Sequence, residues 1–140
     1  MPTKPAAPAI LRSPLGQVRG LGSAKSGSAH WWAQRLTAIA LVPLTLWFVF
    51  AVIRLAGLPR AAVMPRAAVM HWAAQPLVAG LLIALVLTTF HHLQLGLQTV
   101  IEDYVPSEHT RLAWLLVMKA ASILLALVAV ISVVKLAVAG

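Results

Sequence analysis

Two histidines, a glycine and an aspartate–tyrosine pair stand close together in one apolar segment of this sequence. Residues 91 to 104 read HHLQLGLQTVIEDY and follow the apolar run LLIALVLTTF at residues 81 to 90. Imidazole binds metals and exchanges protons, and a neighbouring carboxylate and phenol can hand a proton or a hydrogen bond to a carbonyl substrate. The segment therefore carries groups for metal binding and proton transfer in apolar surroundings.

These polar residues fall on two stripes of a helix that turns about 100° per residue. The first stripe begins at His92 and continues through Gly96, Thr99 and Asp103. The second begins at His91 and continues through Gln94, Gln98 and Glu102. Polar side chains are costly in hydrocarbon, so both stripes are expected to face protein or a cofactor.

His92 lies deep in this predicted helix, about 13 Å along the axis before Ile101, the last apolar residue. A neutral imidazole at that depth needs a partner, either a metal centre such as haem iron or a hydrogen bond from a neighbouring helix. Gly96, one turn later, leaves room for a flat macrocycle or for close approach of a second helix. From the residues alone, both interpretations stay open.

The other histidines limit how such a metal would be held. His30, His71 and His109 lie at the borders of apolar segments or in loops, and His91 points away from the stripe of His92. A haem with two histidine ligands would therefore need its second ligand from another polypeptide.

The composition indicates an integral membrane protein. Of 140 residues, 61% are hydrophobic and 10% charged, with a mean hydropathy of +0.90, which leaves too little polar surface for a water-soluble fold. The absence of cysteine excludes disulfides and iron–sulfur ligation by this chain. The net charge of +8 comes from basic residues in tails and at hydrophobic borders, which favours attraction to a membrane surface over nucleic-acid binding.

Three apolar segments are each long enough to span a bilayer, which needs about 20 residues. They cover residues 31 to 55, 76 to 101 and 112 to 138, approximately. The predicted fold is all-α, with three transmembrane helices in an up-down-up order. The short connection at residues 105 to 111 predicts that the second and third helices are antiparallel neighbours, and Pro43 predicts a mild kink in the first.

Outside the spans, two segments are expected to be irregular. Residues 1 to 29 are rich in Pro, Gly, Ser and Ala with basic residues, which predicts a disordered basic tail or, alternatively, an organellar transit peptide. Residues 59 to 70 repeat PRAAVM in tandem, which indicates a duplication in a tolerant loop. Residues 30 to 140 then form the three-helix membrane domain.

Two motifs in register resemble one known family. The spacing of His92, Gly96 and the Asp103–Tyr104 pair, in the second of three spans, is similar to that of the hydrophobic membrane anchor subunit of bacterial succinate dehydrogenase. The opening of the first span, HWWAQRLTA at residues 30 to 38, resembles the same family's first helix. The resemblance covers residues 30 to 136, approximately, and leaves the tail unassigned.

The resemblance implies half of a heterodimeric membrane anchor that binds haem b together with a sister cytochrome b subunit. Such an anchor tethers the flavoprotein and iron–sulfur subunits, binds ubiquinone, and serves electron transfer from succinate to quinone in the tricarboxylic acid cycle. The implied location is the bacterial inner membrane, with several spans and a cytoplasmic N-terminus. The chain is not an enzyme on its own, because it has no dinucleotide loop or soluble domain for hydride chemistry.

Residue roles follow from the same resemblance. His92 is implied as an axial ligand of the haem iron, and Gly96 as the clearance for the ring. The sequence departs from the family pattern in having His91 beside His92, so the choice of ligand depends on the spacing to Gly96 and Asp103.

At the end of the second span, Tyr104 is implied as a hydrogen-bond donor to the quinone, with Asp103 beside it. Arg35 and His30, near the start of the first span, are implied as partners of a haem propionate or of the quinone pocket. Residue by residue, anchoring of Tyr104 at the membrane interface and snorkelling of Arg35 to the headgroups are simpler interpretations.

Two other functions compete with this prediction. The first is a cofactor-free structural anchor or assembly protein, in which the histidines and glycines only pack helices. The second is a small transporter, which is disfavoured because three helices do not enclose a pathway unless the chain oligomerises and the only deep ionisable groups are histidines.

Overall fold

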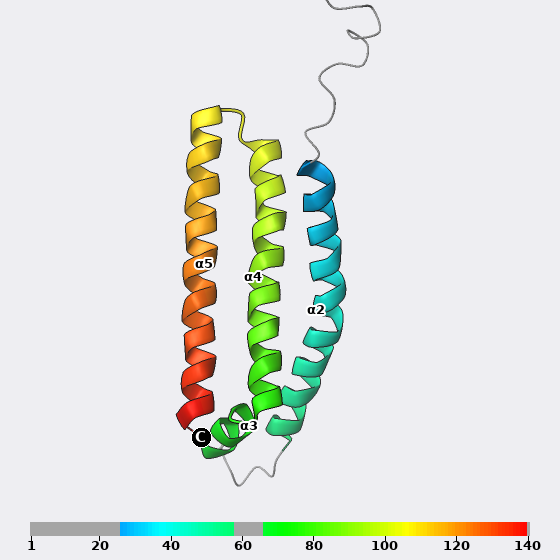
Figure 1. Cartoon of the computed structure of the whole chain (residues 1–140), viewed down its shortest axis with the longest axis vertical. Coiled ribbons are helices and arrows are strands. Elements are labelled where there is room, and N and C mark those ends of the chain that lie inside the picture. The colour runs from blue at the N-terminus through cyan, green and yellow to red at the C-terminus, as the bar shows by residue number, and fades with distance from the viewer. Residues whose placement is uncertain (1–25, 58–65, 140) are drawn as a thin grey trace, which may run out of the picture.

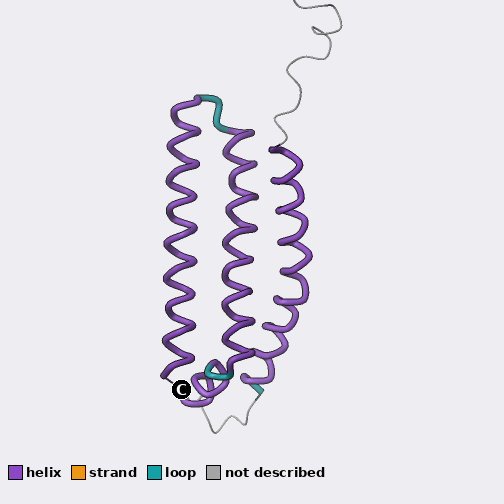
Figure 2. Tube along the Cα trace, viewed as in Figure 1, coloured by secondary structure: helices purple, strands orange, loops and turns teal. Residues whose placement is uncertain are grey.

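The computed structural model describes residues 26–57 and 66–139, and all regular secondary structure in these ranges is helical (Figure 2). The helices are α2 (Ser26–Ala56), α3 (Arg66–Ala73), α4 (Pro76–Tyr104) and α5 (Glu108–Ala139). The predicted all-α class is confirmed.

Helices α2, α4 and α5 are each long and apolar enough to cross a membrane. They contain the three predicted spans and extend beyond them at their polar ends. Helix α4, with 29 residues, is about 44 Å long, against about 30 Å for the hydrocarbon layer. The polar ends of the helices are therefore long enough to reach the headgroup regions, as expected for a multi-pass membrane protein.

The ends of α4 follow from its local sequence. Pro76 occupies the first turn, where its missing N–H costs no hydrogen bond. At the other end Val105 is extended, with φ −100° and ψ 106°, because Pro106 disfavours a helical residue before it. Glu108 then begins α5 with a favourable negative charge in the first turn. The turn at 105–107 makes α4 and α5 antiparallel, as predicted.

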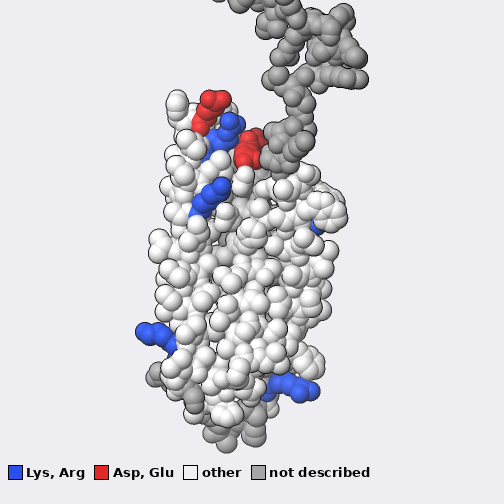
Figure 3. All heavy atoms as spheres, in the orientation of Figure 1, with Lys and Arg blue, Asp and Glu red and all other residues white. Residues whose placement is uncertain are grey.

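Helix α4 lies between α2 and α5 and contacts both of them (Figure 1). Few apolar side chains of the described residues are buried in this arrangement; they are Ala73, Val78, Leu95 and Met118. Most of the large apolar side chains face outward, and charged side chains gather toward the ends, with an uncharged belt between them (Figure 3). Such a surface suits lipid and other membrane subunits.

The short helix α3 was not predicted, because its residues were assigned to the loop that contains the PRAAVM repeat. Residues of the second copy form the start of α3, which contacts α4 and α5. The ring of Trp72 in α3 stacks on Trp47 of α2, with centroids 6.2 Å apart. This tertiary contact supports a helix too short to be stable alone. The first copy, residues 59 to 64, lies outside the described residues.

Helix α2 contains Pro43 and is visibly curved, in agreement with the mild bend expected of an internal proline (Figure 1). It begins at Ser26, within the segment 1 to 29 that was predicted to be a tail. The rest of that predicted tail, residues 1 to 25, lies outside the described residues.

Candidate functional site

The polar stripe that begins at His92 faces helix α2. Its residues meet three polar residues of α2 that are themselves spaced by four and three positions and so share one face of that helix. We call this set the polar ladder; it consists of His30, Gln34 and Thr37 on α2 and His92, Gly96 and Thr99 on α4. Because the numbering falls along α2 while it rises along α4, the two helices are antiparallel.

The first contact of the ladder joins His92 to Thr37. The Nδ1 atom of His92 lies 2.8 Å from Oγ1 of Thr37, which is a hydrogen bond between the two helices in a partly buried position. The same hydroxyl donates within α2 to the carbonyl oxygens of Ala33, at 2.8 Å, and Gln34, at 3.1 Å. Within the described chain, no other hydrogen bond reaches the His92 ring. The second ring nitrogen, Nε2, is therefore without a partner there.

The second contact is made by Gly96 and Gln34. A Cβ atom at position 96 would lie 3.6 Å from Nε2 of Gln34, which is ordinary van der Waals contact. The amide of Gln34 thus lies against the surface that the missing side chain leaves free. Its Oε1 atom is buried and has no hydrogen-bond partner in the described chain, a state that costs about 1–3 kcal/mol.

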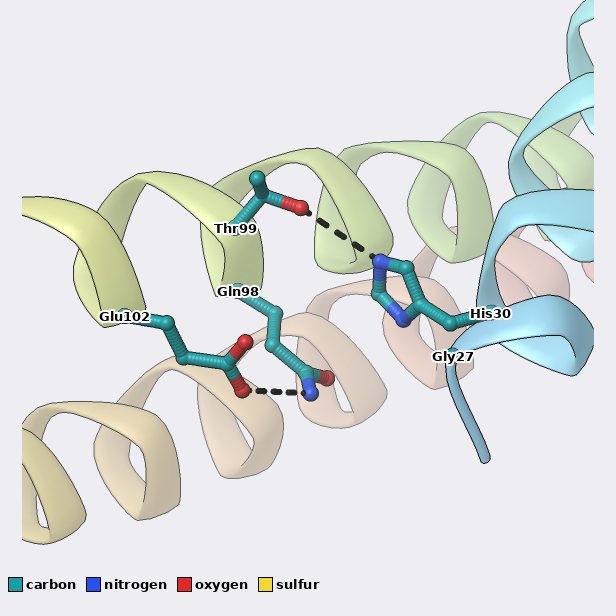
Figure 4. A pocket seen from close by; sticks show the side chains of 5 residues that line it. All are labelled: Gly27, His30, Gln98, Thr99 and Glu102. Atoms are coloured by element: carbon teal, nitrogen blue, oxygen red, sulfur yellow. Dashed lines mark hydrogen bonds between the residues drawn. The ribbon is translucent and has the colours of Figure 1, made fainter. Parts of the chain in front are cut away.

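The third contact joins Thr99 to His30, with 3.4 Å between Oγ1 and Nε2 (Figure 4). The Thr99 hydroxyl also donates to the carbonyl of Leu95 at 3.2 Å. Nearby, the amide of Gln98 donates to Glu102 at 2.8 Å, a contact within the second predicted stripe. This end of the ladder is therefore more loosely connected than the contact at His92.

Two open cavities adjoin this third contact, and His30, Thr99 and Gly27 line both of them. One, of about 500 Å³, is completed by Gln98 and Glu102 (Figure 4). The other, of about 460 Å³, extends toward Trp31 and the Gln34–Gly96 contact. The cavities thus lie at the end of α4 that carries Asp103 and Tyr104.

The remaining predicted site residues lie outside the ladder. Tyr104 is the last residue of α4 and 81% exposed, and Asp103 beside it is exposed as well. The guanidinium of Arg35 lies 5.3 Å from the ring centroid of Trp31, one turn earlier on α2. His91 is exposed and makes no hydrogen bond within the described chain. The structure thus brings together His30, His92, Gly96 and Thr99, and leaves Arg35, Asp103 and Tyr104 at the surface.

Thr37 and Gln34 are members of the ladder to which the sequence alone gave no role. Their signal was their spacing from His30, which places all three residues on one face of the first span. The spacing could be read from the sequence, but it did not show that these residues contact the His92 stripe. That conclusion needs the packing of α2 against α4.

The donor set of the described residues limits the kind of metal site. No group of three or more His, Asp or Glu side chains converges there, so this part of the chain does not enclose a metal ion alone. A single imidazole such as that of His92 fits a centre whose other ligands come from elsewhere.

Comparison with known proteins assigns the family. Residues 10–129 match the succinate dehydrogenase/fumarate reductase transmembrane subunit family. The chain is 34% identical, over 81% of its length and 86% of the relative's, to the succinate dehydrogenase hydrophobic membrane anchor subunit of Rickettsia bellii (strain RML369-C). It is 32% identical to the succinate dehydrogenase membrane anchor subunit of Reclinomonas americana, over 63% of this chain and 71% of that one.

A third relative, the hydrophobic membrane anchor subunit of Paracoccus denitrificans, is 30% identical over 66% of this chain and 67% of its own length. No solved structure matches the chain significantly. The family match covers the polar ladder and all three candidate spans in large part. This chain belongs to the succinate dehydrogenase/fumarate reductase transmembrane subunit family.

Proposed function

We propose that this chain is the hydrophobic membrane anchor subunit of succinate dehydrogenase and that it helps to bind haem b and ubiquinone. Its relatives carry the name of that subunit, and its three spanning helices suit an anchor. In this role the chain tethers the flavoprotein and iron–sulfur subunits and pairs with a cytochrome b subunit in a bacterial inner membrane. Its N-terminus is cytoplasmic.

The exposed side chains of the spanning helices support the presence of a partner subunit. His91 lies in the interior of a spanning helix and is exposed, as are most large apolar side chains of the three long helices. A polar side chain at that depth is costly against lipid, so a second protein is the favourable neighbour. A subunit that covers this part of α4 removes that cost.

His92 carries the haem part of the proposal. Its ring is deep in the span, one nitrogen is held by Thr37, and the other is without a partner in the described chain. Histidines that bind metals commonly donate the N–H of their second ring nitrogen to a fixed neighbour, a place that Thr37 would take here. The donor chemistry therefore fits haem iron, which His92 would hold together with a residue of the cytochrome b subunit. When bound, haem supplies one-electron redox chemistry.

Other residues of the chain hold the edges of that site. Gly96 leaves the side of α4 beside His92 free of a side chain, and the neighbouring Gln34 amide can move aside at low cost because it is the flexible end of a side chain. Arg35 and His30 carry cationic or hydrogen-bonding groups toward the start of α2, which suit a haem propionate or the rim of the quinone pocket.

At the end of α4, Tyr104 and Asp103 suit a quinone headgroup. The tyrosine hydroxyl donates a hydrogen bond to a quinone carbonyl, and the carboxylate beside it can take and release a proton as the quinone is reduced. Both side chains are exposed in the isolated chain, and open cavities that include His30 and Glu102 lie at this end. Electrons from succinate would then reach quinone at the membrane face where the iron–sulfur subunit docks.

The test is the reduced-minus-oxidised spectrum of the purified complex with single substitutions. We expect His92→Ala to abolish the haem b signal while His91→Ala, its neighbour on the second stripe, retains it. The opposite result would assign the ligand to His91. Normal haem in both variants and in a complex lacking this chain would favour the competing role, a cofactor-free anchor.

A further inference from the structure

The contact between Thr37 and His92 limits which nitrogen of the imidazole can carry the hydrogen. The Thr37 hydroxyl has one hydrogen and three close neighbours, namely two backbone carbonyl oxygens and the Nδ1 atom of His92. A carbonyl oxygen only accepts hydrogen bonds. The Thr37 hydrogen and the protonation of Nδ1 must therefore be assigned together.

One assignment places a hydrogen in each of the two shortest contacts of the hydroxyl. The hydroxyl donates to the carbonyl of Ala33 at 2.8 Å, and Nδ1–H of His92 donates to the hydroxyl oxygen at 2.8 Å. In the reverse assignment the hydroxyl donates to a bare Nδ1, and its oxygen then lies 2.8 and 3.1 Å from two carbonyl oxygens with no hydrogen between them. Unshared close contacts between acceptors are unfavourable, particularly at low dielectric.

We propose that Thr37 is a positioning residue that fixes His92 as the Nδ1–H tautomer and so leaves the lone pair of Nε2 free for a metal. The inference rests on the proposed function, because it takes the ligand to be haem iron. It adds a specific role for a residue on a different helix. Through this hydrogen bond α2 orients a ligand that α4 carries.

Thr37 is suited to this role because its hydroxyl is itself fixed by α2. Its hydrogen is directed to the carbonyl of Ala33, which leaves the oxygen free to accept from His92, so that one chain of hydrogen bonds runs from imidazole to hydroxyl to backbone. Thr45, further along α2, makes the same kind of bonds to the carbonyls of Leu41 and Val42 but is exposed and makes no hydrogen bond to the described part of α4. Thr45 is therefore a matched control.

The hydrogen bond also affects the iron electronically. Donation from Nδ1–H makes the imidazole a more basic ligand, and a more basic ligand favours the ferric over the ferrous state. Loss of the acceptor at position 37 should weaken retention of the haem and raise its reduction potential. Neither effect is expected if Thr37 only fills space between the helices.

The experiment compares Thr37→Val, which keeps the shape and removes the hydroxyl, with Thr37→Ser, which keeps the hydroxyl, and with Thr45→Val. Haem per complex and the haem midpoint potential are measured on the purified complex. We expect Thr37→Val to bind haem about tenfold or more weakly, with a more positive potential for the haem that remains. Thr37→Ser and Thr45→Val should resemble the wild type.

Wild-type haem content and potential in Thr37→Val would overturn the role of Thr37. If the Thr37→Val complex does not assemble, the effect of the hydroxyl is measured by comparing Thr37→Ala with Thr37→Ser. Equal haem content and equal midpoint potential in these two variants would also overturn the role of Thr37. His92→Ala separates the two levels. Normal haem in that variant refutes the proposed role of His92 as the ligand, whereas loss of haem there with normal haem in Thr37→Val refutes only the inference about Thr37.

Discussion

On one side helix α4 meets α2 through the polar ladder, and on the other it meets α5 through packing alone. Hydrogen bonds cross between α2 and α4 at His92 and at Thr99. Toward α5, the buried residues are Met118 and Ser122, and the Ser122 hydroxyl bonds within its own helix, 3.8 Å from the sulfur of Met118. Among the described residues, no hydrogen bond joins α4 to α5.

The two interfaces of α4 therefore differ in what they contain. The contact with α5 consists of helix packing, whereas the contact with α2 also brings together polar side chains that could bind a ligand. The turn of three residues already makes α4 and α5 neighbours, so no specific polar contact is needed to pair them. Packing of small and apolar groups is the ordinary means of helix association in lipid. The α2–α4 interface instead contains histidines, an unsatisfied glutamine oxygen and a glycine. Such an interface is costly to bury, and it is explained by a ligand more readily than by stability.

The largest expected effect that tests this contrast comes from filling the position of Gly96. In Gly96→Leu the Cβ would meet the Gln34 amide at 3.6 Å, and the rest of the side chain would take up the space beside His92. We expect loss of most of the haem, measured as haem per purified complex. The control is Gly80→Leu on the same helix, where a Cβ meets nothing within 4 Å. Equal haem in the two variants would show that the gap at position 96 serves helix packing only.

The next effect concerns the α5 side. Met118→Ala removes one of the few buried side chains at the interface, and we expect the complex to lose about 2 kcal/mol of stability, the lower range for truncating a buried methionine. Thermal inactivation in detergent would measure this loss. The haem spectrum and potential should stay at their wild-type values. A shifted haem spectrum in Met118→Ala would contradict the proposal that haem lies at His92 and Gly96, away from the α5 interface.

A smaller effect is expected beyond the ladder, at the end of α4. Tyr104→Phe keeps the ring and removes the hydroxyl. The lost hydrogen bond should raise the barrier to quinone reduction by about 1 kcal/mol, which makes the reaction roughly fivefold slower. Succinate oxidation with an artificial soluble acceptor should be unchanged, because that reaction does not use the quinone site. Equal loss of both activities would show that Tyr104 serves assembly.

The spans could be predicted from the sequence because length and hydropathy are local properties. The face of α4 that carries His92, Gly96 and Thr99 could be predicted for the same reason, since helical periodicity is local. Periodicity does not say which helix covers that face or in which register. The pairings of His92 with Thr37 and of Thr99 with His30 are properties of the packed chain and required the structure.

Two further features could not be predicted from the sequence, because they also depend on contacts between helices. Helix α3 depends on the stacking of Trp72 on Trp47, a contact between residues far apart in the sequence. Arg35 and His30 were grouped by resemblance, yet five positions along a helix turn the side chains about 140° apart. In the structure His30 joins the ladder while Arg35 lies over Trp31 at the surface.

The smallest expected effect lies within the ladder itself, at its weaker contact. Thr99→Val removes a hydrogen bond of 3.4 Å to His30, and the Thr99 hydroxyl has a second partner in its own helix, so little is lost. We expect a loss of about 0.6 kcal/mol in thermal stability, the average for a hydrogen bond between membrane helices, with normal haem content. Ser132→Ala on α5, where the hydroxyl bonds only its own backbone, is the control. If Thr99→Val removed haem as Thr37→Val is expected to, the ladder would act as one unit, and the special position of the Thr37–His92 contact would have to be given up.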